Sequence, residues 1–147
     1  MNSGSDNKDC ITREAFVRLL FDKDPKELAG LIPSENLYYA SEEIDRRSAA
    51  ALVHIFLREI QKEPDITDIT PASILRDLYD CRVCVDHIAQ VYLKGIMESF
   101  DYKELSKTGK AGEFLLFDGL KKVTSKEAAE YRDRVLNMAQ RLKNPTK

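Results

Sequence analysis

The sequence of 147 residues is poor in cysteine, with only Cys10, Cys81 and Cys84. A small, odd number of cysteines excludes the disulfide framework of a small secreted domain. Basic and acidic residues nearly balance, with a net charge of −2, so the basic excess typical of a nucleic-acid-binding protein is missing. No apolar run reaches the roughly 18 residues that a membrane-spanning helix needs. We therefore expect neither nucleic acid nor a membrane span among the features of this chain.

Sequence motifs of common enzymes are also missing. The chain has no glycine-rich phosphate loop, no dinucleotide-binding fingerprint and no G-x-S-x-G elbow. Histidine occurs only twice, which leaves little of the usual general-base chemistry. We expect a protein that is not an enzyme and that carries no cofactor.

What is present is enough hydrophobic sequence, 43% of the residues, to build one core without a metal or a disulfide. The polar start predicts a disordered segment at residues 1–10, followed by a single helical domain at residues 11–147. The N-terminus lacks the apolar region of a secretory signal. The expected location is the cytoplasm, or the cell surface if the chain is a fragment of an exported protein.

Apolar residues recur at helical spacing along most of the chain. Five predicted helices open at a residue that commonly caps helix N-termini: Thr12, Asp24, Ser41, Thr70 and Thr124. The longest covers residues 41–62, and a sixth helix is predicted at residues 83–97. The apolar stretch 114–117 could form a short strand, but the sequence shows no partner for it. The predicted fold class is all-α, a compact bundle of about six helices.

Three segments, 11–16, 44–49 and 123–128, share a pattern. In each, an aliphatic residue precedes a capping residue, and a polar stretch then leads into an apolar helix. Any capped amphipathic helix has some of these features, but a second pattern adds to them. This second pattern is an order of short motifs that ends in a glycine- and phenylalanine-rich loop and then the third segment. The motifs before the loop are, in order, Asp77-Leu78, Val83-Cys84, Ile88 and the stretch 92–97 with its Gly-Ile pair.

This order resembles one S-layer homology repeat, and the segments at 11–21 and 44–57 resemble the closing helices of two further, divergent repeats. The resemblance implies a pseudo-threefold helical bundle whose grooves bind acidic cell-wall polysaccharide. Arg13 and Arg46 match the motif arginine of that family and are the ligand-binding candidates, while Ser125 takes this place in the last segment. An arginine at a helix start offers a planar fork to a carboxylate.

The expected function is thus a non-catalytic binding module that recognises cell-wall polysaccharide or a surface protein partner. An alternative is a cytoplasmic helical interaction protein that keeps the helix arrangement without the glycan site. A second alternative is a thiol or zinc protein built on Cys81, Cys84 and His87, whose spacing of three residues suits metal ligands.

In the zinc hypothesis, Cys10 or His54 would supply the fourth ligand. In the redox hypothesis, the C-x-x-C pair lies at a helix N-terminus that lowers the thiol pKa. A third interpretation makes both cysteines small buried hydrophobic residues, and His54 a partly buried structural histidine.

Overall fold

The structure, a computed structural model, describes residues 9–101 and 115–137. Five α-helices lie in this part of the chain: α2 (Arg13–Phe21), α3 (Glu35–Tyr38), α4 (Arg46–Ile55), α5 (Val85–Leu93) and α6 (Ser125–Leu136). The predicted all-α character is confirmed, with five α-helices in the described ranges where about six were expected. α3 lies in a stretch that the sequence analysis did not assign to a helix. Of the segment 1–10 that was predicted to be disordered, residues 1–8 lie outside the described part of the chain, while the Asp9 carbonyl accepts from the Ser125 N–H and Cys10 pairs with Thr124.

Shorter helical turns replace two of the expected helices. The helix expected at Asp24-Pro25 is the 3-10 helix η1 (Pro25–Leu28), which Asp24 caps as predicted by accepting from the Lys26 N–H. The helix expected after Thr70 is divided into η3 (Thr70–Ile74) and η4 (Leu78–Asp80). It is divided because Leu75 is extended and pairs with Leu115, while the Arg76 N–H donates to the Leu115 carbonyl.

A short antiparallel pair of strands lies beside these turns. β1 (Phe100–Asp101) pairs with β2 (Leu115–Leu116), so that Phe100 faces Leu116. The strand that the apolar stretch 114–117 suggested is therefore present at Leu115–Leu116, and its partner is β1. The sequence did not reveal this partner because the two strands are only two residues long.

The long helix begins later than the sequence predicts. Ser41 is not its cap; the cap is Asp45, whose carboxylate accepts from the Ser48 N–H at 2.9 Å. α4 then continues into one π-helical turn, η2 (Phe56–Ile60). The residues before Asp45 are engaged elsewhere, since Glu43 pairs with Thr12 and Ile44 bonds to other segments.

Three distant segments meet in a closed ring of backbone hydrogen bonds. The Ile11 N–H donates to the Val123 carbonyl at 2.9 Å, and the Val123 N–H donates to the Ile44 carbonyl at 3.0 Å. The Ile44 N–H closes the ring by donating to the Ile11 carbonyl at 3.0 Å. All three side chains are buried. Each is followed by the N-cap of a helix, so the ring brings together the starts of α2, α4 and α6: Thr12, Asp45 and Thr124.

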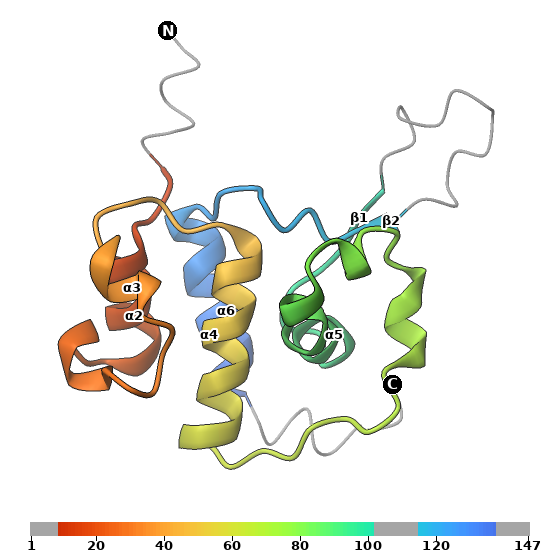
Figure 1. Cartoon of the computed structure of the whole chain (residues 1–147), viewed down its shortest axis with the longest axis horizontal. Helices are drawn as coiled ribbons and strands as arrows, with labels where there is room; N and C mark the ends of the chain where they lie inside the picture. The colour runs from red at the N-terminus through yellow and green to blue at the C-terminus, as the bar shows by residue number, and fades with distance from the viewer. Residues whose placement is uncertain (1–8, 102–114, 138–147) are drawn as a thin grey trace, which may run out of the picture.

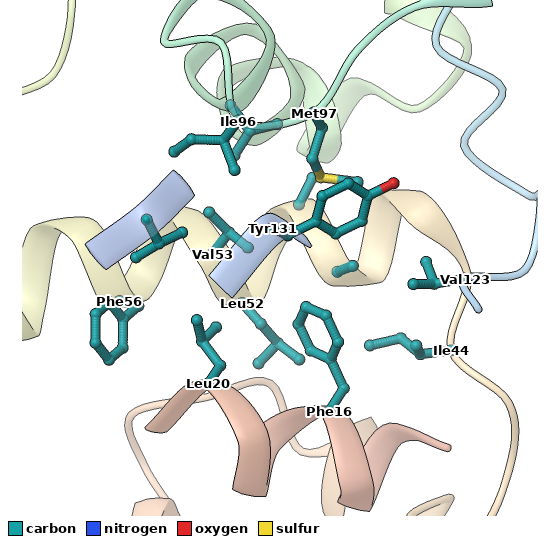
Figure 2. Close-up of a cluster of buried hydrophobic side chains, with 14 of the residues drawn as sticks. Phe16, Leu20, Ile44, Leu52, Val53, Phe56, Ile96, Met97, Val123 and Tyr131 are labelled. Carbon is teal, nitrogen blue, oxygen red and sulfur yellow. The ribbon is translucent and has the colours of Figure 1, made fainter. Parts of the chain in front are cut away.

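The hydrophobic core lies on both sides of α4. Figure 1 shows α4 beside α6, with α2 and α3 on one side and α5 on the other. Phe16 and Leu20 of α2 point toward Leu52 of α4, and Ile96 and Met97 approach from the opposite side (Figure 2). All five are buried, which removes their apolar surface from water and stabilises the helix packing.

None of the helices in residues 9–101 and 115–137 combines the length and the apolar character needed to cross a membrane.

Candidate functional site

Arg46, one of the two predicted ligand-binding residues, lies entirely inside the protein. Its side chain leaves no exposed surface. Nε donates to the Phe117 carbonyl at 2.9 Å, Nη1 donates to Tyr131 Oη at 2.7 Å, and Nη2 donates to the Glu98 carbonyl. Burial raises the pKa of Tyr131 to about 12, so the phenol that accepts from Arg46 stays neutral.

Two aromatic rings enclose the same guanidinium. Its central carbon lies 4.6 Å from the centroid of Phe100 and 4.5 Å from that of Phe117, which is cation–π distance. Arg46 therefore joins the start of α4 to β1, to α6 and to the chain after β2. The structure thus places this predicted ligand-binding residue in the core, with no exposed surface.

Arg13, the second candidate, is mostly buried between α2 and α3. Its Nη1 donates to Asn36 Oδ1 at 3.1 Å and lies 4.0 Å from the Glu35 carboxylate. Its Nε is buried and has no acceptor among the described residues. The side chain retains 13% of its exposed surface, so only its edge is available to a ligand. The sequence pattern thus located two arginines that fasten helix starts to neighbouring segments.

The predicted zinc ligands do not converge. Cys81 and Cys84 form a disulfide with each other, and His87 bonds to His54 instead of approaching the sulfurs. The third cysteine, Cys10, pairs with Thr124 at the start of α6. Across residues 9–101 and 115–137, no group of three or more His, Cys, Asp or Glu side chains is arranged to hold a metal ion. The donor set therefore does not fit zinc.

The two histidines instead form a chain of hydrogen bonds with a carboxylate. His54 Nε2 lies 2.8 Å from Asp65 Oδ1, and His54 Nδ1 lies 2.9 Å from His87 Nδ1. Because the carboxylate can only accept, His54 donates through Nε2 and accepts at Nδ1 from the His87 N–H. His54 is 2% exposed, as the structural interpretation of this residue expected. Burial, and then the neighbouring His54, lowers the pKa of His87.

An open pocket of about 530 Å³ lies where α2, η1 and the end of α3 meet. We call it the Tyr38 pocket; it is lined by Glu14, Arg18, Asp24, Pro25, Lys26, Ala29, Leu37, Tyr38 and Ala40. Tyr38 is 80% exposed, the second most exposed of the large hydrophobic residues in the described ranges. Arg18 is held at the rim by Glu14 and Asp24, each at 2.7 Å. The sequence shows the Tyr38-Tyr39 pair, but only the fold places it beside η1.

A smaller open pocket of about 160 Å³ lies beside the disulfide. We call it the Cys81 pocket; its polar lining consists of Cys81, Arg47 and three aspartates, Asp77, Asp80 and Asp118. The Asp77 carboxylate accepts from the Phe117 and Asp118 N–H groups, both at 2.8 Å, which holds the chain after β2 against η4. The sequence identified the C-x-x-C motif here but not the aspartates around it, which come from two distant segments.

Neither Arg13 nor Arg46 lines the Tyr38 pocket or the Cys81 pocket. Two accessible features of the described residues are thus an aromatic pocket with a charged rim and a disulfide beside an acidic pocket. In comparisons with known proteins, no family model matches the chain, and no curated protein and no solved structure is significantly similar to it.

Proposed function

We propose that the chain is a non-catalytic binding module, organised like an S-layer homology domain, which binds cell-wall polysaccharide through the Tyr38 pocket. The observation that carries the proposal is the pocket itself, in which an exposed tyrosine ring and an apolar floor adjoin four charged side chains. The arginines that the family resemblance suggested are not the binding residues in this proposal.

The ring of Ile11, Ile44 and Val123 supports the pseudo-threefold organisation. Each of the three segments donates one backbone hydrogen bond to a second segment and accepts one from the third. Each then opens a helix through a side-chain cap. Equivalent partners at three equivalent sequence positions are what three diverged repeats around one axis would have.

The chemistry of the Tyr38 pocket suits a sugar ring. A pyranose has an apolar C–H face that packs on an aromatic ring, and hydroxyl groups around its edge that need hydrogen-bond partners. Tyr38 supplies the ring, with Pro25 and Leu37 adding apolar surface. The carboxylates of Glu14 and Asp24 can accept hydrogen bonds from the sugar hydroxyl groups. The neighbouring cations, Arg18 and Lys26, can bind the acidic groups of such a polysaccharide.

Two positive charges, on Arg18 and Lys26, lie at the rim of the pocket. Hydrogen bonding to the Lys26 N–H and the nearby Arg18 cation lower the pKa of Asp24, so this carboxylate is ionised at neutral pH and fixes the Arg18 fork. Glu14 and Asp24 occupy the Nε and Nη2 donors of Arg18, so its Nη1 group and the Lys26 ammonium are the cationic groups in this proposal that bind a carboxylate substituent.

The test is co-sedimentation of the purified chain with Gram-positive cell-wall sacculi, before and after the secondary polysaccharide is stripped. We expect binding that is lost on stripping and that weakens at least about tenfold in Tyr38→Ala, the effect of losing about 1.4 kcal/mol of contact energy. Tyr79→Ala is the matched control, because Tyr79 is also an exposed tyrosine, 65% exposed, outside the pocket.

Each contrary result has its own meaning. Equal binding by Tyr38→Ala and Tyr79→Ala would remove the Tyr38 pocket from the proposal. Binding that survives stripping would contradict the secondary polysaccharide as the ligand and would assign the binding to a component that stays in the sacculi. A chain that does not sediment with sacculi at all would favour the helical interaction protein without a glycan site.

A further inference from the structure

We infer that the Cys81–Cys84 disulfide is a redox-active centre that oxidises a dithiol on a partner protein. This activity goes beyond the proposed function: polysaccharide binding at the Tyr38 pocket is itself non-catalytic, and the redox reaction at the disulfide is independent of it. It rests on four features of the described residues: the position of the disulfide, its accessibility, the charges around each sulfur, and the surface beside it.

The disulfide closes the turn that leads into α5. The two cysteines are three residues apart, with the 3-10 turn η5 (Arg82–Cys84) between them, and the Cys84 N–H donates to the Cys81 carbonyl at 3.0 Å. Cys84 is the N-cap residue of the nine-residue helix α5. The bond thus joins two positions that the local backbone already holds close, so that reduction leaves the sulfurs near each other for re-oxidation.

Both sulfur-bearing residues are accessible. Cys81 and Cys84 are each half-buried, and Cys81 lines the open Cys81 pocket. A pocket of about 160 Å³ admits the tip of a cysteine side chain, the group that must reach a sulfur to exchange with it. The third cysteine differs, since burial raises the pKa of the Cys10 thiol and so lowers its reactivity.

The surroundings distinguish the two sulfurs. Cys84 lies at the positive end of α5, which favours a thiolate there, while the exposed Arg82 lies between the two cysteines and favours a thiolate at both. Asp86, in the first turn of α5, opposes part of this effect. Cys81 lines the pocket together with Asp77, Asp80 and Asp118, and these three carboxylates disfavour a thiolate there, against the single opposing charge of Arg47. Cys84 is therefore the better leaving group, and Cys81 is the sulfur that a partner attacks.

The exposed apolar residues near the disulfide suit a protein substrate. Val83 is 84% exposed, Tyr79 is 65% exposed and Leu120, at the pocket edge, is 63% exposed. Exposed apolar side chains beside a reactive group provide contact area for a docked polypeptide, which a small thiol cannot use. The substrate class is accordingly a protein with two neighbouring cysteine thiols.

The reaction balances as a two-electron exchange. A thiolate of the partner attacks Cys81 Sγ, the Cys81–Cys84 bond breaks, and its electron pair leaves on Cys84 Sγ, which takes up a proton. The partner's second thiolate then attacks the partner's first sulfur in the mixed disulfide. The bond to Cys81 Sγ breaks, and Cys81 Sγ leaves as a thiolate that takes up a proton. The partner dithiol is oxidised to a disulfide, and Cys81 and Cys84 are reduced to thiols.

The first experiment uses the intact chain and dithiothreitol as the dithiol probe. The chain is equilibrated, from its oxidised and from its reduced form, in buffers of graded dithiothreitol redox ratio, and free thiols are counted by alkylation and mass spectrometry. We expect Cys81 and Cys84 to change state together, with the same endpoint from both directions and an unchanged circular dichroism spectrum. A disulfide reduced only when the chain unfolds, or thiols that do not re-form it, would overturn the inference.

The second experiment assigns the roles of the two sulfurs. Cys81→Ser retains Cys84, and Cys84→Ser retains Cys81; each reacts with 5,5′-dithiobis(2-nitrobenzoate) over a range of pH. We expect Cys84 to react about tenfold faster at neutral pH than Cys81, with the lower thiol pKa. The reverse order, or equal rates, would contradict the assignment of Cys84 as leaving group. A purely structural disulfide predicts no such difference. The intact-chain measurement stands even if one variant does not fold.

Discussion

Arg46 is the largest fully buried side chain among the described residues. A buried cation is costly unless its donors are satisfied, and here three acceptors and two aromatic rings compensate for the lost water. The residue that the sequence pattern selected for ligand binding therefore has a structural role. The sequence motif places Arg46 at the start of a helix. The groups that its side chain contacts, however, come from residues 98 to 131, far along the chain.

We predict that Arg46→Ala lowers the free energy of unfolding by about 3–5 kcal/mol. The substitution leaves a cavity between Phe100 and Phe117 and removes the donors to the buried Phe117 carbonyl and to the Glu98 carbonyl. Urea unfolding followed by circular dichroism measures the change. Arg132→Ala, at an exposed position of α6, is the control, with an expected change within about 0.5 kcal/mol. Similar losses in both variants would contradict the structural role of Arg46.

The pH dependence of stability contains a contribution from His87. The pKa of His87 is lowered from 6.5 in the folded chain. Burial, His54 and Arg58 oppose the charged imidazolium, and together they outweigh Asp86 and Asp65, which favour it. Well above pH 6.5 the imidazole is neutral in both states. As the pH falls through 6.5, the unfolded chain binds a proton that the folded chain does not, so stability decreases.

We therefore expect the free energy of unfolding to fall between about pH 8 and about pH 5, and to fall less steeply in His87→Asn. Asparagine keeps a donor close to the position of Nδ1, which preserves the bond to His54 while removing the titration. Urea unfolding at several pH values gives the two slopes. Parallel slopes would show that His87 does not contribute.

At the scale of the elements, the helix starts are set by caps that the local sequence already contains. Thr12 accepts from the Ala15 N–H, and Thr124 forms the predicted capping box with Glu127. Ser41 fails as a cap because the ring holds Ile44 in an extended segment, which delays the helix until Asp45. On the sequence, the apolar face of this last helix is expected to include Met138, Ala139 and Leu142, which lie outside the described residues.

We predict that Thr124→Ala destabilises the chain by about 1 kcal/mol, with a range of roughly 0.5–2 kcal/mol. The change removes the Oγ1 acceptor for the Glu127 N–H, whereas the backbone N–H of residue 124 still donates to the Glu127 carboxylate. Thermal or urea unfolding reports the loss. Ser125→Ala alters the next, exposed residue without touching the box and should be nearly neutral. A cost for Ser125→Ala as large as that for Thr124→Ala would refute the cap.

At the scale of the whole molecule, the ring of Ile11, Ile44 and Val123 links the beginning, the middle and the last described helix of the chain. Breaking any one of its hydrogen bonds requires one segment to leave the buried centre where three helix starts meet. Segments coupled in this way unfold together.

We predict that the amide hydrogens of these three residues exchange with solvent only through global unfolding. Their exchange free energies should agree with one another and with the free energy from urea unfolding, as measured by native-state hydrogen exchange. The amide of Tyr39 at the end of the four-residue helix α3 serves as a comparison, since its bond to the Glu35 carbonyl lies at the surface. A weaker protection of Ile11 than of Val123 would mean that the first segment opens separately.

Much of the helical content could be predicted because helix signals are local. A capping side chain, a proline in the first turn and an apolar stripe act within a few residues of each other. Thr12, Asp24 and Thr124 are caps for that reason. The division of the helix after Thr70 was not predictable in this way, because Leu75 is drawn into pairing with Leu115, forty residues later.

By itself, the sequence determined the all-α character, several of the helix starts and the presence of a C-x-x-C pair, since each depends on neighbours along the chain. The tertiary structure alone decided which side chains face solvent. It buried Arg46 against two carbonyl groups and a tyrosine hydroxyl, turned His87 toward His54, and left Tyr38 exposed over the pocket beside η1. These outcomes depend on packing between distant segments, where the burial of apolar surface and the satisfaction of buried polar groups act together.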